Sequence, residues 1–385
     1  MEHLLNQEVK NIEISGIRKF FNLVQGKEDI ISLTIGQPDF HTPDHVKEAG
    51  KNALDLNYTT YTPNAGIIEL REAIQHFIKQ KYHLSYRAEN EIIVTIGASQ
   101  AIDIAFRTIL SPGDEVILPG PVYPGYEPLI RLSKAKPVFI DTRENKFKMT
   151  AELIEPFLTS KTKCIILPYP SNPTGVTLSK EELKEISELI KDRPIFILSD
   201  EIYSELVFEG RHHSIGEFEE VRKQTLIIQG LSKSHSMTGF RLGYLLLPKE
   251  IQKHALKVHQ YSVSCASSIS QYAALKALTD GIDDPIKMKE TYQNRRDYVI
   301  SRLKEMNIEV HNPNGAFYVF PKIPKNNEAS FDFCLRLVNE ANLALVPGDA
   351  FSKYGEGYMR LSYAYDENTL KEGLDRLEVF LSDHL

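Results

Sequence analysis

One lysine stands among small hydroxyl residues in the stretch SKSHSMTGFRLG, residues 232–243, eight positions ahead of an arginine. A lysine held in a desolvated site can lose its proton and act as a nucleophile toward carbonyl groups. Arg241 supplies a further cation in the same stretch. An isolated loop lysine is usually only solvated, so a chemical role for Lys233 depends on what the rest of the chain brings to it.

Polar residues also follow two apolar segments. Asp200, with Glu201 and Tyr203 behind it, follows IFILS, and Asn172 stands in the turn SNPTG after KCIILPYP. A carboxylate at the end of a buried strand needs a cationic or protonated partner, and a Pro/Gly turn would hold the amide rigidly. Taken singly, a solvated strand end and a purely structural turn explain these letters as well.

A turn of small residues follows a third apolar run, EIIVT, and opens a helical pattern at residues 97–100. The free N–H groups and the dipole at the start of a helix suit a phosphate group. A helix start without any ligand would show the same letters, so this turn gains meaning only beside the other groups.

The surrounding elements predict that these residues meet. Short apolar runs alternate with helical patterns from EIIVTIG to TLIIQG, which is typical of crossover units and a mostly parallel, buried sheet. In open α/β sheets ligands bind beyond the carboxyl ends of the strands, where these polar residues stand. We expect the sheet, sandwiched by helices, to form a large domain over residues 41–285.

A smaller domain is expected at the C-terminal end. The segment after Asp284 carries apolar residues at helical spacing and predicts a long amphipathic helix. Beyond it, GAFYVFP and MRLSYA predict a strand pair, and two helical patterns complete an α+β domain over residues 286–385. Residues 1–40 are expected to form an N-terminal arm and part of this small domain.

Together these segments supply a phosphate seat, an amide, a carboxylate with a tyrosine, a nucleophilic lysine and a further cation. One cofactor needs that whole set: pyridoxal 5′-phosphate, which binds a lysine as a Schiff base and requires an acidic partner for its ring nitrogen. The sequence therefore predicts a site for pyridoxal phosphate and a small-molecule substrate.

Composition and missing motifs argue against other classes. The 45 Lys+Arg and 52 Asp+Glu give a net charge of −7 with no block of like charge, which argues against nucleic-acid or anionic-membrane partners. No signal segment or apolar run of about 20 residues occurs, so a cytoplasmic protein is expected. The absence of G-x-G-x-x-G and G-K-[ST] argues against a nicotinamide dehydrogenase and a nucleotidase.

No metal site is predicted. The three cysteines, Cys164, Cys265 and Cys334, show none of the paired spacings of zinc sites, and free thiols are expected. His235 is expected either to contact Lys233 without touching the ligand or to be solvated.

Six collinear segments resemble the class I aminotransferases of fold type I over nearly all 385 residues. These segments are LTIGQPDF, YTPNAGIIELREAI, YPSNPTG, SDEIYSEL, SKSHSMTGFRLG and YMRLSYA. The resemblance implies a fold type I transferase that uses pyridoxal phosphate to exchange amino groups between an amino acid and a 2-oxo acid. It also implies a homodimer with shared active sites.

The resemblance assigns roles to residues of this chain. Lys233 would bind the cofactor and move the substrate proton, Asp200 would keep the ring nitrogen protonated, and Tyr203 would hydrogen-bond the ring oxygen. The cofactor contacts implied are Ala98, Ser99, Gln100, Tyr123, Asn172, Asp200, Tyr203, Ser232, Lys233 and Arg241, with Tyr61 reaching the neighbouring subunit's phosphate. The substrate carboxylate would be bound by Arg360, helped by Asn172 and the backbone of Gly36.

The substrate is suggested by a finer resemblance. EISGIRKF, GLSKSHSMTG and VHQYSVSCASSISQ look like the N-acetyl-L,L-diaminopimelate aminotransferases of lysine biosynthesis, which implies glutamate and N-acetyl-L-2-amino-6-oxopimelate as substrates. Aspartate or aromatic amino acid transamination, a carbon–sulfur β-lyase, a racemase and a non-catalytic sensor are the alternatives. Ser99 stands where aspartate-specific relatives place a lysine, and Arg18 is a candidate to replace that cation.

Overall fold

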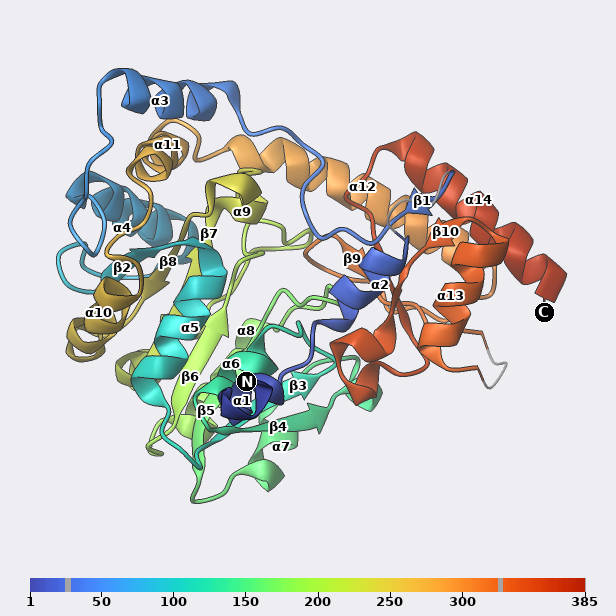
Figure 1. The fold of residues 1–385 in the computed structure, drawn as a ribbon, viewed down its shortest axis with the longest axis horizontal. Coiled ribbons are helices and arrows are strands. Elements are labelled where there is room, and N and C mark those ends of the chain that lie inside the picture. The colour runs from blue at the N-terminus through green and yellow to red at the C-terminus, as the bar shows by residue number, and fades with distance from the viewer. Residues whose placement is uncertain (25–28, 325–327, 385) are drawn as a thin grey trace.

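A central sheet of seven strands organises the computed structural model, which describes residues 1–24, 29–324 and 328–384 (Figure 1). The strand order is β2-β8-β7-β6-β5-β3-β4, and only β8 runs against its neighbours. The expectation of a mostly parallel sheet is confirmed. The strands are β2 (Ile92–Thr95), β3 (Glu115–Gly120), β4 (Lys136–Asp141), β5 (Thr162–Leu167), β6 (Phe196–Asp200), β7 (Thr225–Gly230) and β8 (Gly243–Leu246).

Helices cover both faces of this sheet because its strands are apolar on both sides, as buried parallel strands usually are. One face packs against α5 (Gly97–Ile109), α6 (Tyr126–Leu132) and α10 (Lys249–Val263). The other face packs at one end against α4 (Ile68–Tyr82) and α11 (Ser268–Thr279), with α3 (Asp44–Asp55) beyond α11. Its other end packs against α7 (Ala151–Ile154) and α8 (Lys180–Ile190).

A second core lies beside the sheet and includes the C-terminal elements (Figure 1). The long predicted helix is present as α12 (Asp284–Glu305) and leads into this part of the chain. The predicted strand pair is also present: β9 (Tyr318–Val319) pairs antiparallel with β12 (Met359–Ser362), which pairs with β11 (Val346–Pro347). Helices α13 (Ser330–Glu340) and α14 (Glu367–His384) pack around them.

The N-terminal segment joins this second core. Strand β1 (Ile31–Ser32) pairs in parallel with β10 (Leu343–Ala344). After the short helix α1 (Gln7–Lys10), helix α2 (Gly16–Val24) buries Phe20 and Val24 in the same core. Gly16 lies so close to Ala350 that a Cβ there would stand 2.9 Å from the Ala350 Cβ, so the start of α2 is fixed against the C-terminal part.

Within the described residues, no helix combines the length and apolarity needed to cross a bilayer. The same residues include no group of three or more His, Cys, Asp or Glu side chains arranged to hold a metal ion. Cys164 and Cys334 are buried, Cys265 is partly exposed, and all three are free thiols.

Candidate active site

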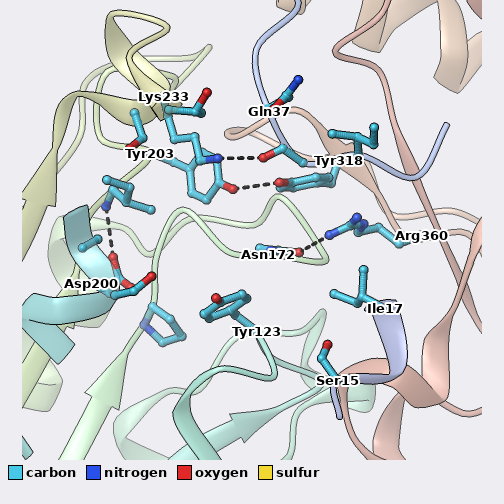
Figure 2. A pocket seen from close by; sticks show the side chains of 18 of the residues that line it. Ser15, Ile17, Gln37, Tyr123, Asn172, Asp200, Tyr203, Lys233, Tyr318 and Arg360 are labelled. Carbon is cyan, nitrogen blue, oxygen red and sulfur yellow. Dashed lines mark hydrogen bonds between the residues drawn. The ribbon is translucent and has the colours of Figure 1, made fainter. Parts of the chain in front are cut away.

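A cavity of about 700 Å³ lies where the carboxyl ends of the central strands face the second core. Three parts of the chain line it: the N-terminal segment, the loops after the strands of the central sheet, and the small sheet (Figure 2). Of the residues predicted for the site, it brings together Gly36, Ala98, Ser99, Tyr123, Asn172, Asp200, Tyr203, Ser232, Lys233, Arg241 and Arg360.

Lys233 enters the cavity from α9 (Leu231–Ser234), a single helical turn directly after β7. Its Nζ donates a hydrogen bond to the carbonyl oxygen of Gly36 at 2.6 Å (Figure 2). Burial, together with the nearby cations Arg360 and Arg241, lowers the pKa of Lys233 to about 8, and Asp200 opposes this shift. The amine is therefore far easier to deprotonate than an ordinary lysine.

Asp200 ends β6, and the next residue, Glu201, points to the opposite face, as successive strand residues do. Asp200 faces the cavity, where its Oδ2 accepts a hydrogen bond from Tyr126 Oη at 2.7 Å and its Oδ1 accepts one from Ile202 N at 3.2 Å. Burial raises the pKa of Asp200 to about 6, while these two donors oppose the rise. Glu201 lies outside the cavity and pairs with His212 at 3.0 Å.

Arg360 comes from β12 and is buried. Its Nη1 donates to Asn172 Oδ1 at 2.9 Å, and its Nη2 donates to the carbonyl oxygen of Thr34 at 2.5 Å (Figure 2). These acceptors are neutral, Nε has no hydrogen-bond partner, and no described carboxylate forms an ion pair with this guanidinium. A buried cation without an anionic partner is costly, so the site is suited to receive a carboxylate.

The start of α5 forms a second place for an anion. The side chain of its N-cap residue, Ile96, accepts no hydrogen bond, so it leaves the N–H groups of the first turn uncapped. Gly97 has φ +71°, and a Cβ at this position would stand 2.7 Å from Arg241 Nη2. Arg241 and Ser232 line the same cavity as Ala98 and Ser99, which gives a phosphate both N–H groups and a cation.

Aromatic side chains complete the cavity. Tyr203 Oη and Tyr318 Oη lie 2.8 Å apart in a hydrogen bond (Figure 2). Tyr123 packs edge-on against Tyr126 with ring centroids 5.5 Å apart. The pKa of Tyr203 is raised well above its ordinary value, with burial the largest cause. These phenols therefore remain protonated hydrogen-bonding groups.

The cavity carries an excess of positive charge. Among the described residues that line it, four are basic, namely Arg18, Lys233, Arg241 and Arg360. One, Asp200, is acidic. A ligand that brings a dianionic phosphate and one or two carboxylates would balance these charges.

Three predicted features fall outside this arrangement. Gln100 does not line the cavity, because its Oε1 turns back to accept a hydrogen bond from Ile96 N at 2.7 Å. Tyr61 is 88% exposed and does not line the cavity of its own chain. His235 is fully buried, with its Nε2 2.9 Å from the Gly281 carbonyl oxygen, so the expectation that it could be solvated is wrong.

The cavity also contains residues that the sequence did not point to. Tyr126 and Tyr318 were not predicted for the site, although Tyr126 stands three residues after Tyr123 in the segment GPVYPGY. Thr238 lies between Lys233 and Arg241 in the sequence, and only that proximity could have suggested it.

Comparison with known proteins decides the family. The family model described as aminotransferase class I and II matches residues 28–377. The chain belongs to this family. It is 63% identical over 381 residues to a probable N-acetyl-LL-diaminopimelate aminotransferase of Bacillus subtilis, covering 99% of this chain and 96% of that protein.

More distant aminotransferases match over the same extent. An aromatic-amino-acid aminotransferase of Thermococcus litoralis is 39% identical over 98% of both chains. The solved structure of the aspartate aminotransferase from Thermus thermophilus with maleate superposes with a TM-score of 0.92 at 36% identity, covering 97% of this chain and 99% of that one. The chain is thus a fold type I aminotransferase that depends on pyridoxal phosphate.

The cavity of this aminotransferase fits that cofactor. Because residue 97 is a glycine, Arg241 can lie close to the start of α5, where no side chain caps the first N–H groups. The phosphate could bind there. Asp200 offers a buried carboxylate for the ring nitrogen, and Lys233 offers an amine of lowered pKa in the same cavity. Among the described residues that line the cavity, Asp200 is the only carboxylate, so no other acidic side chain there would repel the phosphate.

Proposed function

We propose that this aminotransferase transfers an amino group between glutamate and the 6-oxo carbon of N-acetyl-L-2-amino-6-oxopimelate, in the diaminopimelate route to lysine. The observation that carries the proposal is the convergence of Lys233, Asp200 and Arg360 on one cavity, in a chain 63% identical to a relative named for that substrate. Relatives named for aspartate or aromatic amino acids match at 34–40% identity.

The cofactor would be held by residues that line the cavity. Ser232, Arg241 and the N–H groups of Ala98 and Ser99 would bind its phosphate. Tyr123 would lie against the ring, Asn172 and Tyr203 would hydrogen-bond the ring oxygen, and Asp200 would face the ring nitrogen. Bound pyridoxal phosphate supplies an aldehyde that takes up amino groups and a ring that withdraws electrons.

Lys233 would do the proton transfer. With a pKa of about 8, its Nζ exists partly as the neutral amine near neutral pH and can take the proton from the substrate α-carbon. A general base is most effective when its pKa lies near the working pH, which is the condition that burial and the two arginines create here.

Arg360 would orient the substrate. Its two terminal nitrogens can bind the two oxygens of the α-carboxylate in place of Asn172 and Thr34, with the Gly36 backbone close by. Fixing this carboxylate places the α-carbon within reach of Lys233, and a small loss of position would cost much of the rate.

Three further proposals concern the oligomeric state, the domain boundaries and the cellular location of the enzyme. Two copies of the chain would form a homodimer in which Tyr61 contacts the phosphate of the neighbouring subunit. The large domain would span residues 41–285 and the small one residues 286–385, with residues 1–40 as the arm. The enzyme would work in the cytoplasm, where three free thiols persist.

Absorption spectroscopy and a substrate panel test the proposed function. Glutamate should convert the band of the lysine-bound cofactor to that of the pyridoxamine form, and N-acetyl-L-2-amino-6-oxopimelate should restore it faster than oxaloacetate or phenylpyruvate. Faster turnover of either of those two oxo acids would transfer the proposal to the aspartate or aromatic alternative. Release of a 2-oxo acid from a sulfur amino acid without any acceptor would indicate a β-lyase.

A further inference from the structure

Helix α2 presents one side to the active-site cavity. Ile17, Arg18 and Phe21 line the cavity, while Phe20 and Val24 are buried in the second core. Residues three and four positions apart lie on the same side of a helix, so Ile17, Arg18 and Phe21 form one stripe. Figure 2 shows Ile17, and Ser15 just before the helix, beside Tyr123 and Arg360. The stripe therefore faces the part of the cavity into which a substrate side chain would extend.

Arg18 is the cation of this cavity that the described protein leaves unbound. It makes no hydrogen bond or ion pair with any described residue, whereas its neighbour Lys19 pairs with Glu13 at 2.7 Å. The other cations in the cavity each donate to a neutral oxygen: Lys233 to Gly36, Arg241 to Thr238, and Arg360 to Asn172 and Thr34.

We infer that Arg18 binds the second carboxylate of dicarboxylic substrates, the one remote from the reacting carbon. The inference rests on the proposed function, because both proposed substrates carry such a carboxylate. In glutamate two carbons separate it from the α-carbon, and in the acetamido-oxopimelate four carbons do. The long, exposed side chain of Arg18 can adjust its conformation to reach the distal carboxylate of either substrate. A cation held rigidly inside the cavity could not reach both.

Other residues that line the cavity suit the remainder of these substrates. Ile17, Phe21 and Ile35 offer apolar surface to the methylene chain, and Ser15 and Gln37 offer hydrogen-bonding groups to an acetamide. Ser99, at the start of α5, also lines the cavity and brings a hydroxyl and no charge. Arg18 is thus the described cation best placed for the distal charge, while Arg360 holds the reacting end.

Binding of matched acids to the holoenzyme tests this role without turnover. Pimelate and heptanoate differ only in the distal carboxylate, so calorimetry with both isolates its contribution. We expect the wild-type enzyme to bind pimelate about tenfold more tightly than heptanoate. Arg18→Gln should abolish that difference by weakening pimelate alone, and Arg18→Lys should restore part of it because the charge remains without the planar fork.

Lys19→Gln provides the matched control, because it removes a neighbouring exposed cation that pairs with Glu13 outside the cavity lining. It should leave both affinities unchanged. If Arg18→Gln binds pimelate as tightly as the wild type, or weakens heptanoate equally, Arg18 does not read the distal carboxylate.

The same variants separate this inference from the proposed function. An enzyme that transaminates N-acetyl-L-2-amino-6-oxopimelate while Arg18→Gln leaves the KM for glutamate unchanged would overturn the role of Arg18 alone. An enzyme that ignores this oxo acid while Arg18→Gln raises the KM for glutamate about tenfold, but not that for phenylalanine, would support Arg18 and overturn the proposed substrate.

Discussion

At the scale of single residues, the contact between Tyr126 and Asp200 predicts a pH-dependent effect on stability. The buried Asp200 has a pKa of about 6, above its ordinary value of 3.8, so its ionisation costs folding free energy as pH rises through this window. Tyr126 opposes that cost by donating a hydrogen bond to Oδ2. Tyr126→Phe should raise the pKa of Asp200 further, and the destabilisation should be about 1–2 kcal/mol larger at pH 8 than at pH 4.5.

Urea unfolding of the cofactor-free protein at the two pH values measures this difference. Tyr169→Phe is the matched control, because Tyr169 is also buried but bonds to backbone groups, accepting from Met149 N at 2.8 Å. Its effect should be the same at both pH values. An equal loss for Tyr126→Phe at pH 4.5 and pH 8 would mean that the phenol does not act on the ionised carboxylate.

At the scale of elements, the start of α5 depends on a glycine that no other residue replaces without strain. Gly97 has φ +71°, and a Cβ there would stand 2.7 Å from Arg241 Nη2. Gly97→Ala should cost about 1–2 kcal/mol in backbone strain and also displace the arginine from the proposed phosphate site. We expect the affinity for pyridoxal phosphate to fall about tenfold or more, as measured by spectral titration of the cofactor-free protein.

Gly113 separates the two parts of this prediction. It has φ +91°, but a Cβ there would meet nothing within 4 Å. Gly113→Ala should therefore lower the melting temperature in a similar way and leave the cofactor affinity unchanged. Equal affinity losses in the two variants would show that backbone strain, and not the position of Arg241, weakens the cofactor.

The sequence predicted the positions of the elements better than the contacts between them. Apolar runs followed by polar residues located the strand ends, since parallel strands in one sheet place their carboxyl ends at one edge. The pattern did not reveal β4 or β8, because KPVFID is interrupted by proline and GYLL is only four residues long. Nor did it reveal Tyr126 or Tyr318, because buried aromatic residues have the same letters whether they fill a core or line a cavity.

The direction in which a side chain points was harder to predict than which segments lie near the cavity. His235 follows Lys233 by two residues, yet one helical turn sends it into the protein toward Gly281, while Lys233 enters the cavity. Likewise the strand alternation separates Asp200 from Glu201, and Gln100 folds back onto its own helix start. Such orientations depend on the packing of distant segments, which local patterns do not contain.

At the scale of the whole molecule, the exposed Tyr61 predicts that each active site needs two subunits. This side chain is 88% exposed and lies outside the cavity lining of its own chain, although the resemblance assigns it to the cofactor phosphate. If it acts across the dimer, a Lys233→Ala subunit and a Tyr61→Phe subunit should complement each other. The hybrid then holds one site with Lys233 from the second subunit and Tyr61 from the first.

Co-expression of the two variants with different affinity tags yields that hybrid. Lys233→Ala alone should be inactive, and Tyr61→Phe alone should bind the cofactor about tenfold more weakly, through the loss of one hydrogen bond to a charged group. The purified hybrid should recover the wild-type cofactor affinity in half of its sites, because one site contains neither substitution. If Tyr61 instead serves its own subunit, the only site with Lys233 also carries Tyr61→Phe, and the weakened affinity should persist.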